Sequence, residues 1–213
     1  MGNAEKRKRR EKERQKERAL RRAEAAAGPA APNRIFYPYP TPEALIGVGP
    51  IIIAAWAIPQ ALAQALLASG QAIPRPVEGL MLVDTGAQST CISEAAAQAL
   101  RLQPIRLTKT YGAAGLHENK VYEAHLQIGI DGGKGVRSDF HIELQTICIP
   151  QLHEQMRGVK IDNIERPLIG LLGRDFLRHT KFTYDGAGSV EILVKPDTFG
   201  GPRDGPPAPP PGI

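Results

Sequence analysis

Residues 80–90, with the sequence LMLVDTGAQST, constrain the fold of this chain more than any other segment. The four consecutive apolar residues 80–83 predict a strand that is buried on both faces. This strand runs into a carboxylate, Asp84, and then into a turn at Thr85 and Gly86. Gly86 has no Cβ, so its backbone can adopt a positive φ or be approached closely by another segment. The pattern predicts one charged group held rigidly at the end of a core strand. A plain Asp-Thr-Gly turn fits the tripeptide equally well.

The 213 residues suffice for one sizeable domain with tails. Charge is distributed unevenly along them. Residues 1–26 hold 11 Lys and Arg against five Glu, whereas the remaining chain holds 16 basic and 17 acidic residues. We therefore expect a charged basic arm, helical or disordered, at residues 1–27, and a nearly neutral domain. Attraction of the arm to nucleic acid or an anionic surface is an alternative, which its interleaved glutamates and lack of aromatic residues disfavour.

Proline and alanine delimit the predicted domain. Residues 28–45 are expected to form a Pro/Ala linker whose aromatic residues can dock on the domain. The domain itself is expected at residues 46–195, and residues 196–213 are expected to be a disordered Pro/Gly-rich tail.

An uncharged stretch at residues 44–74 is long enough for a membrane span of about 20 residues. Pro50, Pro59 and several glutamines interrupt it, and its two halves differ in character. The β-branched residues 51–53 predict a strand, and the segment after Pro59 predicts a short helix. We expect a cytoplasmic protein, with a membrane tether through residues 44–68 as the alternative.

The rest of the domain is interpreted mostly as strands and turns. Ser93 is a predicted N-cap of a short helix, and residues 105–111 and 119–130 predict two strands around a Gly-Ala-Ala-Gly tip. Such a small tip suits a mobile lid, although an ordinary hairpin fits it as well. Further strands are predicted at 136–149 and 168–173, followed by a hairpin at 181–194. Cys91 and Cys148 have no metal-ligand spacing and are interpreted as buried apolar side chains, so no metal or cofactor is expected.

Two motifs in this order resemble the signatures of the retropepsin-like (retroviral-type) aspartic protease family. They are VDTGA at residues 83–87 and LLGRDFL at residues 171–177. The resemblance spans roughly residues 46–194, and the helix after the Asp turn is similar to the cellular and bacterial branch. It implies a catalytic residue, Asp84; supporting residues Thr85, Gly86 and Ala87; a flap of Tyr111, Gly112, Ala113, Ala114 and Gly115; and a motif beside the site of Leu171, Leu172, Gly173, Arg174 and Asp175.

The family chemistry needs two carboxylates that share one proton, because like charges about 3 Å apart cannot both ionise. This chain supplies one Asp-Thr-Gly, and Asp185-Gly186 follows a tyrosine rather than a buried apolar run. The resemblance therefore implies an all-β half-barrel with one or two short helices, acting as a homodimeric endopeptidase on peptide or protein substrates. Activity is expected to favour acidic to mildly acidic pH.

One departure from the viral pattern concerns the arginine of the second motif. Gln88 stands where viral members often carry an aspartate that pairs with the arginine matched here by Arg174, and Asp175 could serve Arg174 instead. The alternative from another functional class is a catalytically weak dimerisation or peptide-binding module.

Overall fold

The computed structural model describes residues 11, 34–112, 115–131, 137–150, 152, 160–161 and 164–194. Within these residues the chain is mostly β with four short helices, which confirms the prediction of an all-β domain. The strands are β1 (Arg34–Pro38), β2 (Ile51–Ala57), β3 (Val77–Val83), β4 (Cys91–Ser93), β5 (Arg106–Gly112), β6 (Gly115–Asp131), β7 (Arg137–Ile149), β8 (Lys160–Ile161), β9 (Ile164–Glu165), β10 (Leu168–Leu172), β11 (Thr180–Asp185) and β12 (Ser189–Val194). The helices are α2 (Pro42–Val48), α3 (Gln60–Ala68), α4 (Glu94–Ala99) and α5 (Arg174–Leu177).

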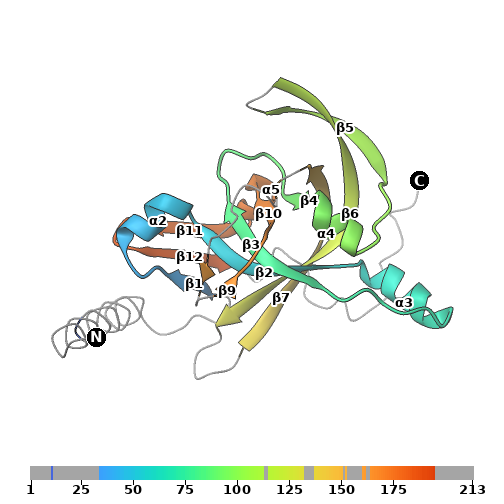
Figure 1. Cartoon of the computed structure of the whole chain (residues 1–213), viewed down its shortest axis with the longest axis horizontal. Coiled ribbons are helices and arrows are strands. Elements are labelled where there is room, and N and C mark those ends of the chain that lie inside the picture. The colour runs from blue at the N-terminus through green and yellow to red at the C-terminus, as the bar shows by residue number, and fades with distance from the viewer. Residues whose placement is uncertain are drawn as a thin grey trace, which may run out of the picture.

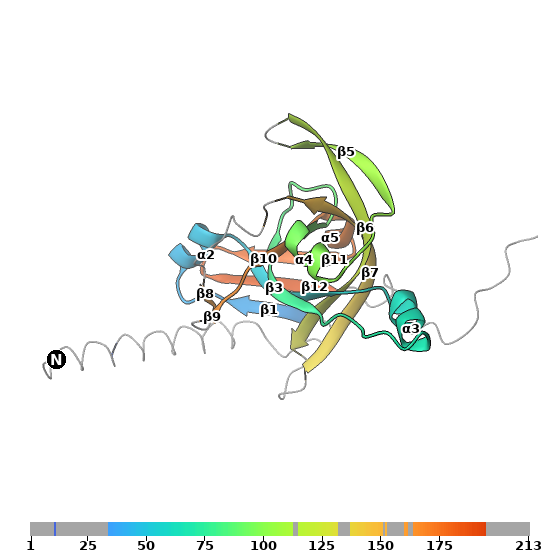
Figure 2. The same cartoon turned by 45° about the vertical axis from the view of Figure 1, so that its right-hand side comes forward.

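A closed barrel forms the centre of the domain (Figure 1). Its sheet has the strand order β2-β3-β10-β4-β7-β6-β5, and an additional antiparallel pairing between β2 and β6 closes the first six strands on themselves. β5 pairs only with β6 in this sheet, so the β5–β6 hairpin extends beyond the barrel (Figure 2). Closure removes the free edges that an open sheet of these apolar strands would expose.

The barrel core is built from the apolar runs that the sequence shows. Alternate residues of β2 point inward, and Ile52 and Trp56 are completely buried. The Trp56 indole N–H donates to the carbonyl oxygen of Ile169 on β10 at 3.2 Å, which satisfies its polar atom inside the core. This bond ties the second motif's strand to β2, on the other side of β3.

A smaller antiparallel sheet has the strand order β1-β12-β11. β1 and the start of α2 lie within residues 28–45, the segment for which the sequence predicts a linker. The Arg34 side chain forms an ion pair with Glu191 of β12 and stacks on Phe36. The Tyr39 hydroxyl accepts from the Ile51 N–H at 2.6 Å, so the aromatic residues of this segment do dock on the domain. Both edges of β12 are thus paired within the chain.

The uncharged residues 44–68 fold into most of α2, all of β2 and all of α3. β2 lies inside the barrel sheet, between β3 and β6. None of the helices in the described part of the chain is long and apolar enough to cross a membrane. The predictions for the basic arm and the Pro/Gly-rich tail fall on residues outside the described ranges, apart from Glu11.

Candidate active site

Asp84 lies where two parallel strands, β3 and β10, end side by side. Its backbone N–H donates to the Leu172 carbonyl oxygen at 3.0 Å, and the preceding Val83 N–H donates to the Pro50 carbonyl oxygen at 2.7 Å. The parallel pairing places the end of the first motif's strand directly against the second motif. The sequence predicted both strands, and the structure shows why their ends meet.

The Asp84 carboxylate is oriented by its own loop. Its Oδ1 accepts from the backbone N–H of Gly86 at 2.8 Å and of Ala87 at 3.2 Å. Its Oδ2 makes no hydrogen bond or ion pair with any residue in the described ranges. The side chain is half-buried, whereas Thr85 and Gly86 are exposed. One carboxylate oxygen is therefore held by the loop, and the side chain remains partly exposed in the single chain.

Gly173 allows the second motif to approach the Asp84 loop. A Cβ at this position would lie 2.4 Å from the Ser89 carbonyl carbon and 2.8 Å from the Thr90 nitrogen. These are backbone atoms, which cannot swing aside as a flexible side chain can. Beyond Gly173, the Arg174 N–H donates to the Ala87 carbonyl oxygen at 3.0 Å and the Asp175 N–H donates to that of Gln88 at 3.2 Å. Residues 84–90 are thus held along their length by the start of α5.

A buried hydroxyl, Thr90, joins the two motifs and was not predicted from the sequence. Its Oγ1 donates to Asp175 Oδ1 at 2.7 Å and accepts from the Gly173 N–H at 3.2 Å. Its backbone N–H lies 2.9 Å from both carboxylate oxygens of Asp175. Asp175 Oδ1 also accepts from the Phe176 N–H at 2.8 Å. Asp175 therefore binds Thr90 and a backbone N–H in the first turn of α5, whereas the sequence suggested it as a partner for Arg174.

Replacing Thr90 with valine should lower the free energy of unfolding by about 3 kcal/mol, because it removes a hydrogen bond to a charged group and leaves the buried Gly173 N–H without an acceptor. Valine keeps the shape of threonine, so the loss isolates the hydroxyl. Urea denaturation measures it. Thr183→Val on β11 is the matched control, since no hydrogen bond of its side chain occurs within the described residues, and we expect a change below about 0.5 kcal/mol. Equal losses in both variants would contradict the assigned role.

The thiol that follows this loop is buried and has a raised pKa. Cys91 is buried and free, and its Sγ donates to the Ser89 carbonyl oxygen at 3.3 Å. Burial, reinforced by the nearby carboxylates of Asp175 and Asp84, raises the pKa of Cys91 to about 12. Because only the thiolate is a good nucleophile, Cys91 is disfavoured as a reactive group of this loop.

The predicted flap is a hairpin that arches above the loop carrying Asp84 in both views (Figures 1 and 2). Tyr111 pairs with Leu116 across its two strands, and they are 86% and 51% exposed. Leu107, on the same face as Tyr111 by strand alternation, is also exposed. Gly112 and Gly115 pair at the end of the ladder, while the predicted tip residues Ala113 and Ala114 lie outside the described ranges.

The barrel, the oriented carboxylate and the second motif beside it make up the candidate site. A family model described as aspartyl protease matches residues 70–176, half of the chain. The match begins before β3 and ends at Phe176, so it includes Asp84, the flap strands and Gly173. The chain belongs to the aspartyl protease family. No curated protein matches it significantly.

Proposed function

We propose that this protein is a retropepsin-like aspartic endopeptidase of the cellular and bacterial branch, active as a homodimer. The observation that carries the proposal is the Asp84 carboxylate, whose Oδ1 is held by two backbone N–H groups while its Oδ2 has no partner within the described residues. A second Asp84 from a partner chain would complete the pair. The exposure of Thr85 and Gly86 supports a contact between two copies at this loop.

In the proposed reaction the two carboxylates share one proton across a two-fold axis. The ionised carboxylate removes a proton from a water molecule as that water attacks the peptide carbonyl carbon. The protonated carboxylate donates a hydrogen bond to the carbonyl oxygen and stabilises its developing charge. The proton taken from water then passes to the amide nitrogen as the C–N bond breaks. Asp84 is accordingly expected to be inert in a monomer.

The deciding experiment measures cleavage of a peptide library by the full chain at several pH values, with and without pepstatin, alongside sedimentation. We expect pepstatin-sensitive cleavage that is fastest at acidic pH and whose specific activity falls on dilution below the dimer dissociation constant. If cleavage is absent under all conditions while the chain sediments as a dimer, the protein is the binding module instead.

Tyr111 is proposed to contact the substrate from the flap. Replacing it with alanine should lower kcat/KM by roughly tenfold, mainly by raising KM, because an aromatic side chain that is exposed in the free enzyme would lose its apolar contact with the substrate. Steady-state kinetics on one cleaved peptide measures the effect. Tyr184→Ala is the matched control, since this tyrosine is exposed on β11 and we expect unchanged kinetics. Equal effects of both substitutions would remove the flap from the proposal.

A further inference from the structure

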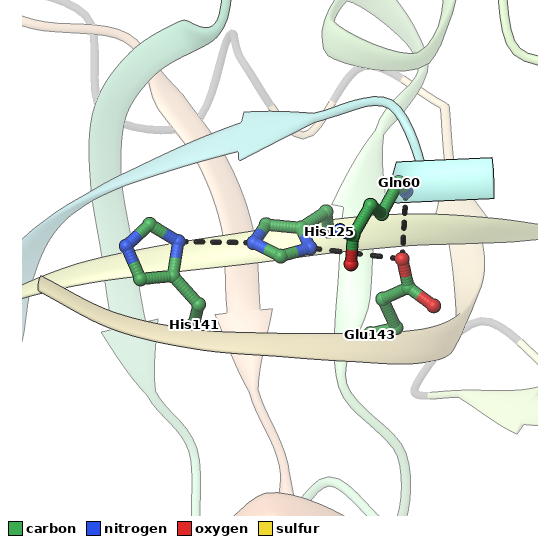
Figure 3. Close-up of polar contacts among 4 residues, drawn as sticks. All are labelled: Gln60, His125, His141 and Glu143. Atoms are coloured by element: carbon green, nitrogen blue, oxygen red, sulfur yellow. Dashed lines mark hydrogen bonds and ion pairs between the residues drawn. The ribbon is translucent and has the colours of Figure 1, made fainter. Parts of the chain in front are cut away.

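Two imidazole rings, those of His125 on β6 and His141 on β7, lie side by side on this pair of strands (Figure 3). The Nε2 atom of His125 is 3.0 Å from the Nδ1 atom of His141, and the ring centroids are 5.2 Å apart. In the β6–β7 register His125 pairs with Glu143, and Gln127 pairs with His141, so the two histidines meet diagonally. Two nitrogens that each can carry a lone pair therefore lie 3.0 Å apart, close enough for one cation to bind both.

Glu143 orients the first of these rings. Its Oε1 lies 3.8 Å from His125 Nδ1 and accepts from the Gln60 N–H, at the start of α3, at 2.7 Å. A carboxylate beside Nδ1 favours the tautomer with the proton there, which leaves the Nε2 lone pair directed at His141. A carboxylate behind a histidine is the usual outer-shell arrangement of a metal ligand.

We propose that His125 Nε2 and His141 Nδ1 form a bidentate site for a divalent transition-metal cation, with Cu²⁺ preferred over Zn²⁺. Neighbouring ligands at about 2.0 Å from a metal are about 2.8 Å apart in square-planar geometry and about 3.3 Å apart in tetrahedral geometry. The observed 3.0 Å lies between these values, and the stability order of divalent ions also favours Cu²⁺ over Zn²⁺. This site is independent of the proposed peptidase activity.

Solvent would complete the coordination. Within the described residues no group of three or more His, Cys, Asp and Glu side chains is placed to hold a metal ion together. His141 is exposed, so water molecules can reach the remaining positions. A cation bound to both nitrogens would lie beside the line that joins them, the proton of their hydrogen bond would be released to solvent, and His141 would carry its proton on Nε2.

Isothermal titration of the full chain with CuCl₂ and with ZnCl₂, in a non-chelating buffer near neutral pH, tests the proposal. We expect tighter binding of Cu²⁺ than of Zn²⁺. Because chelation is lost, His141→Ala should weaken Cu²⁺ binding at least roughly tenfold, and Glu143→Gln should weaken it by roughly tenfold. His117→Ala, which removes an exposed histidine at another place on β6, should leave the Cu²⁺ affinity unchanged. Far-UV circular dichroism verifies that each variant is folded.

Electron paramagnetic resonance of the Cu²⁺-loaded chain provides a second measurement. The spectrum should show two equatorial nitrogen ligands in the wild type and the loss of one in His141→Ala. Equal Cu²⁺ affinities of wild type and His141→Ala, or a nitrogen pattern that this substitution leaves unchanged, would overturn the proposal.

Discussion

Replacement of Asp84 with asparagine is expected to lower kcat/KM for peptide hydrolysis at least roughly 10³-fold without unfolding the chain. Asparagine can neither accept the proton of the attacking water nor carry the shared proton of the pair. Its side-chain oxygen can still accept from the Gly86 and Ala87 N–H groups, so the loop should keep its shape. The measurements are cleavage of the peptide library at the optimal pH and far-UV circular dichroism.

Asp185 provides the matched control for this substitution. Its Oδ1 also accepts from a backbone N–H two residues further on, that of Ala187 at 2.9 Å, but it lies exposed in the β11–β12 turn. Asp185→Asn therefore makes the same chemical change in the same kind of local turn, and we expect full activity. Equal loss of activity in both variants would assign the effect to something other than catalysis.

Mixing the two Asp84 forms tests whether the site is shared between chains. If each active site needs one Asp84 from each chain, a one-to-one mixture equilibrated at fixed total concentration should retain about a quarter of the wild-type activity, since only that fraction of dimers carries two aspartates. If the site were contained in one chain, the same mixture would retain half of the wild-type activity. The mixture thus separates a dimeric dyad from a monomeric enzyme by a factor of two in a single assay.

The local part of this site was predictable from the sequence. Consecutive apolar residues before Asp84 and before Gly173 indicated buried strands, because that pattern depends only on neighbouring positions. Ser93 was predicted as an N-cap, and its side chain accepts from the Ala96 N–H. The N-terminus of α2 carried a comparable signal, Thr41 followed by Pro42. A helix was not predicted there, because residues 28–45 were interpreted as a linker.

The parts that depend on distant residues could not be predicted in this way. β1 pairs with β12 across more than 150 residues, and its sequence, with prolines after it and an arginine at its start, carries no alternation that indicates a partner. Asp175 lies 85 residues from Thr90, and no periodic pattern connects an aspartate in one helix turn to a threonine in another loop. Such contacts are fixed by the closure of the barrel rather than by local propensity.

Gly173 is the position where the two motifs touch, and adding a single methyl group there is expected to separate them. A Cβ would lie 2.4 Å from the Ser89 carbonyl carbon and 2.6 Å from its oxygen, so either α5 or the Asp84 loop must move. We expect Gly173→Ala to lower the free energy of unfolding by about 3 kcal/mol or more, at the upper end for overpacking, because both sides of the contact are backbone. For a domain of this size the midpoint of thermal unfolding should fall by about 6 °C or more.

Activity should respond to Gly173→Ala more strongly than stability does. A movement of the loop would disturb the Gly173 N–H bond to Thr90 Oγ1 and the Leu172 carbonyl contact of Asp84, which together set the position of the carboxylate. A displacement of about 1 Å can cost a reaction roughly 10²-fold. Gly186→Ala is the matched control, because a Cβ there meets nothing within 4 Å, and it should leave both the midpoint and kcat/KM unchanged. If Gly173→Ala kept full activity in the folded state, the contact between the two motifs would not be what positions Asp84.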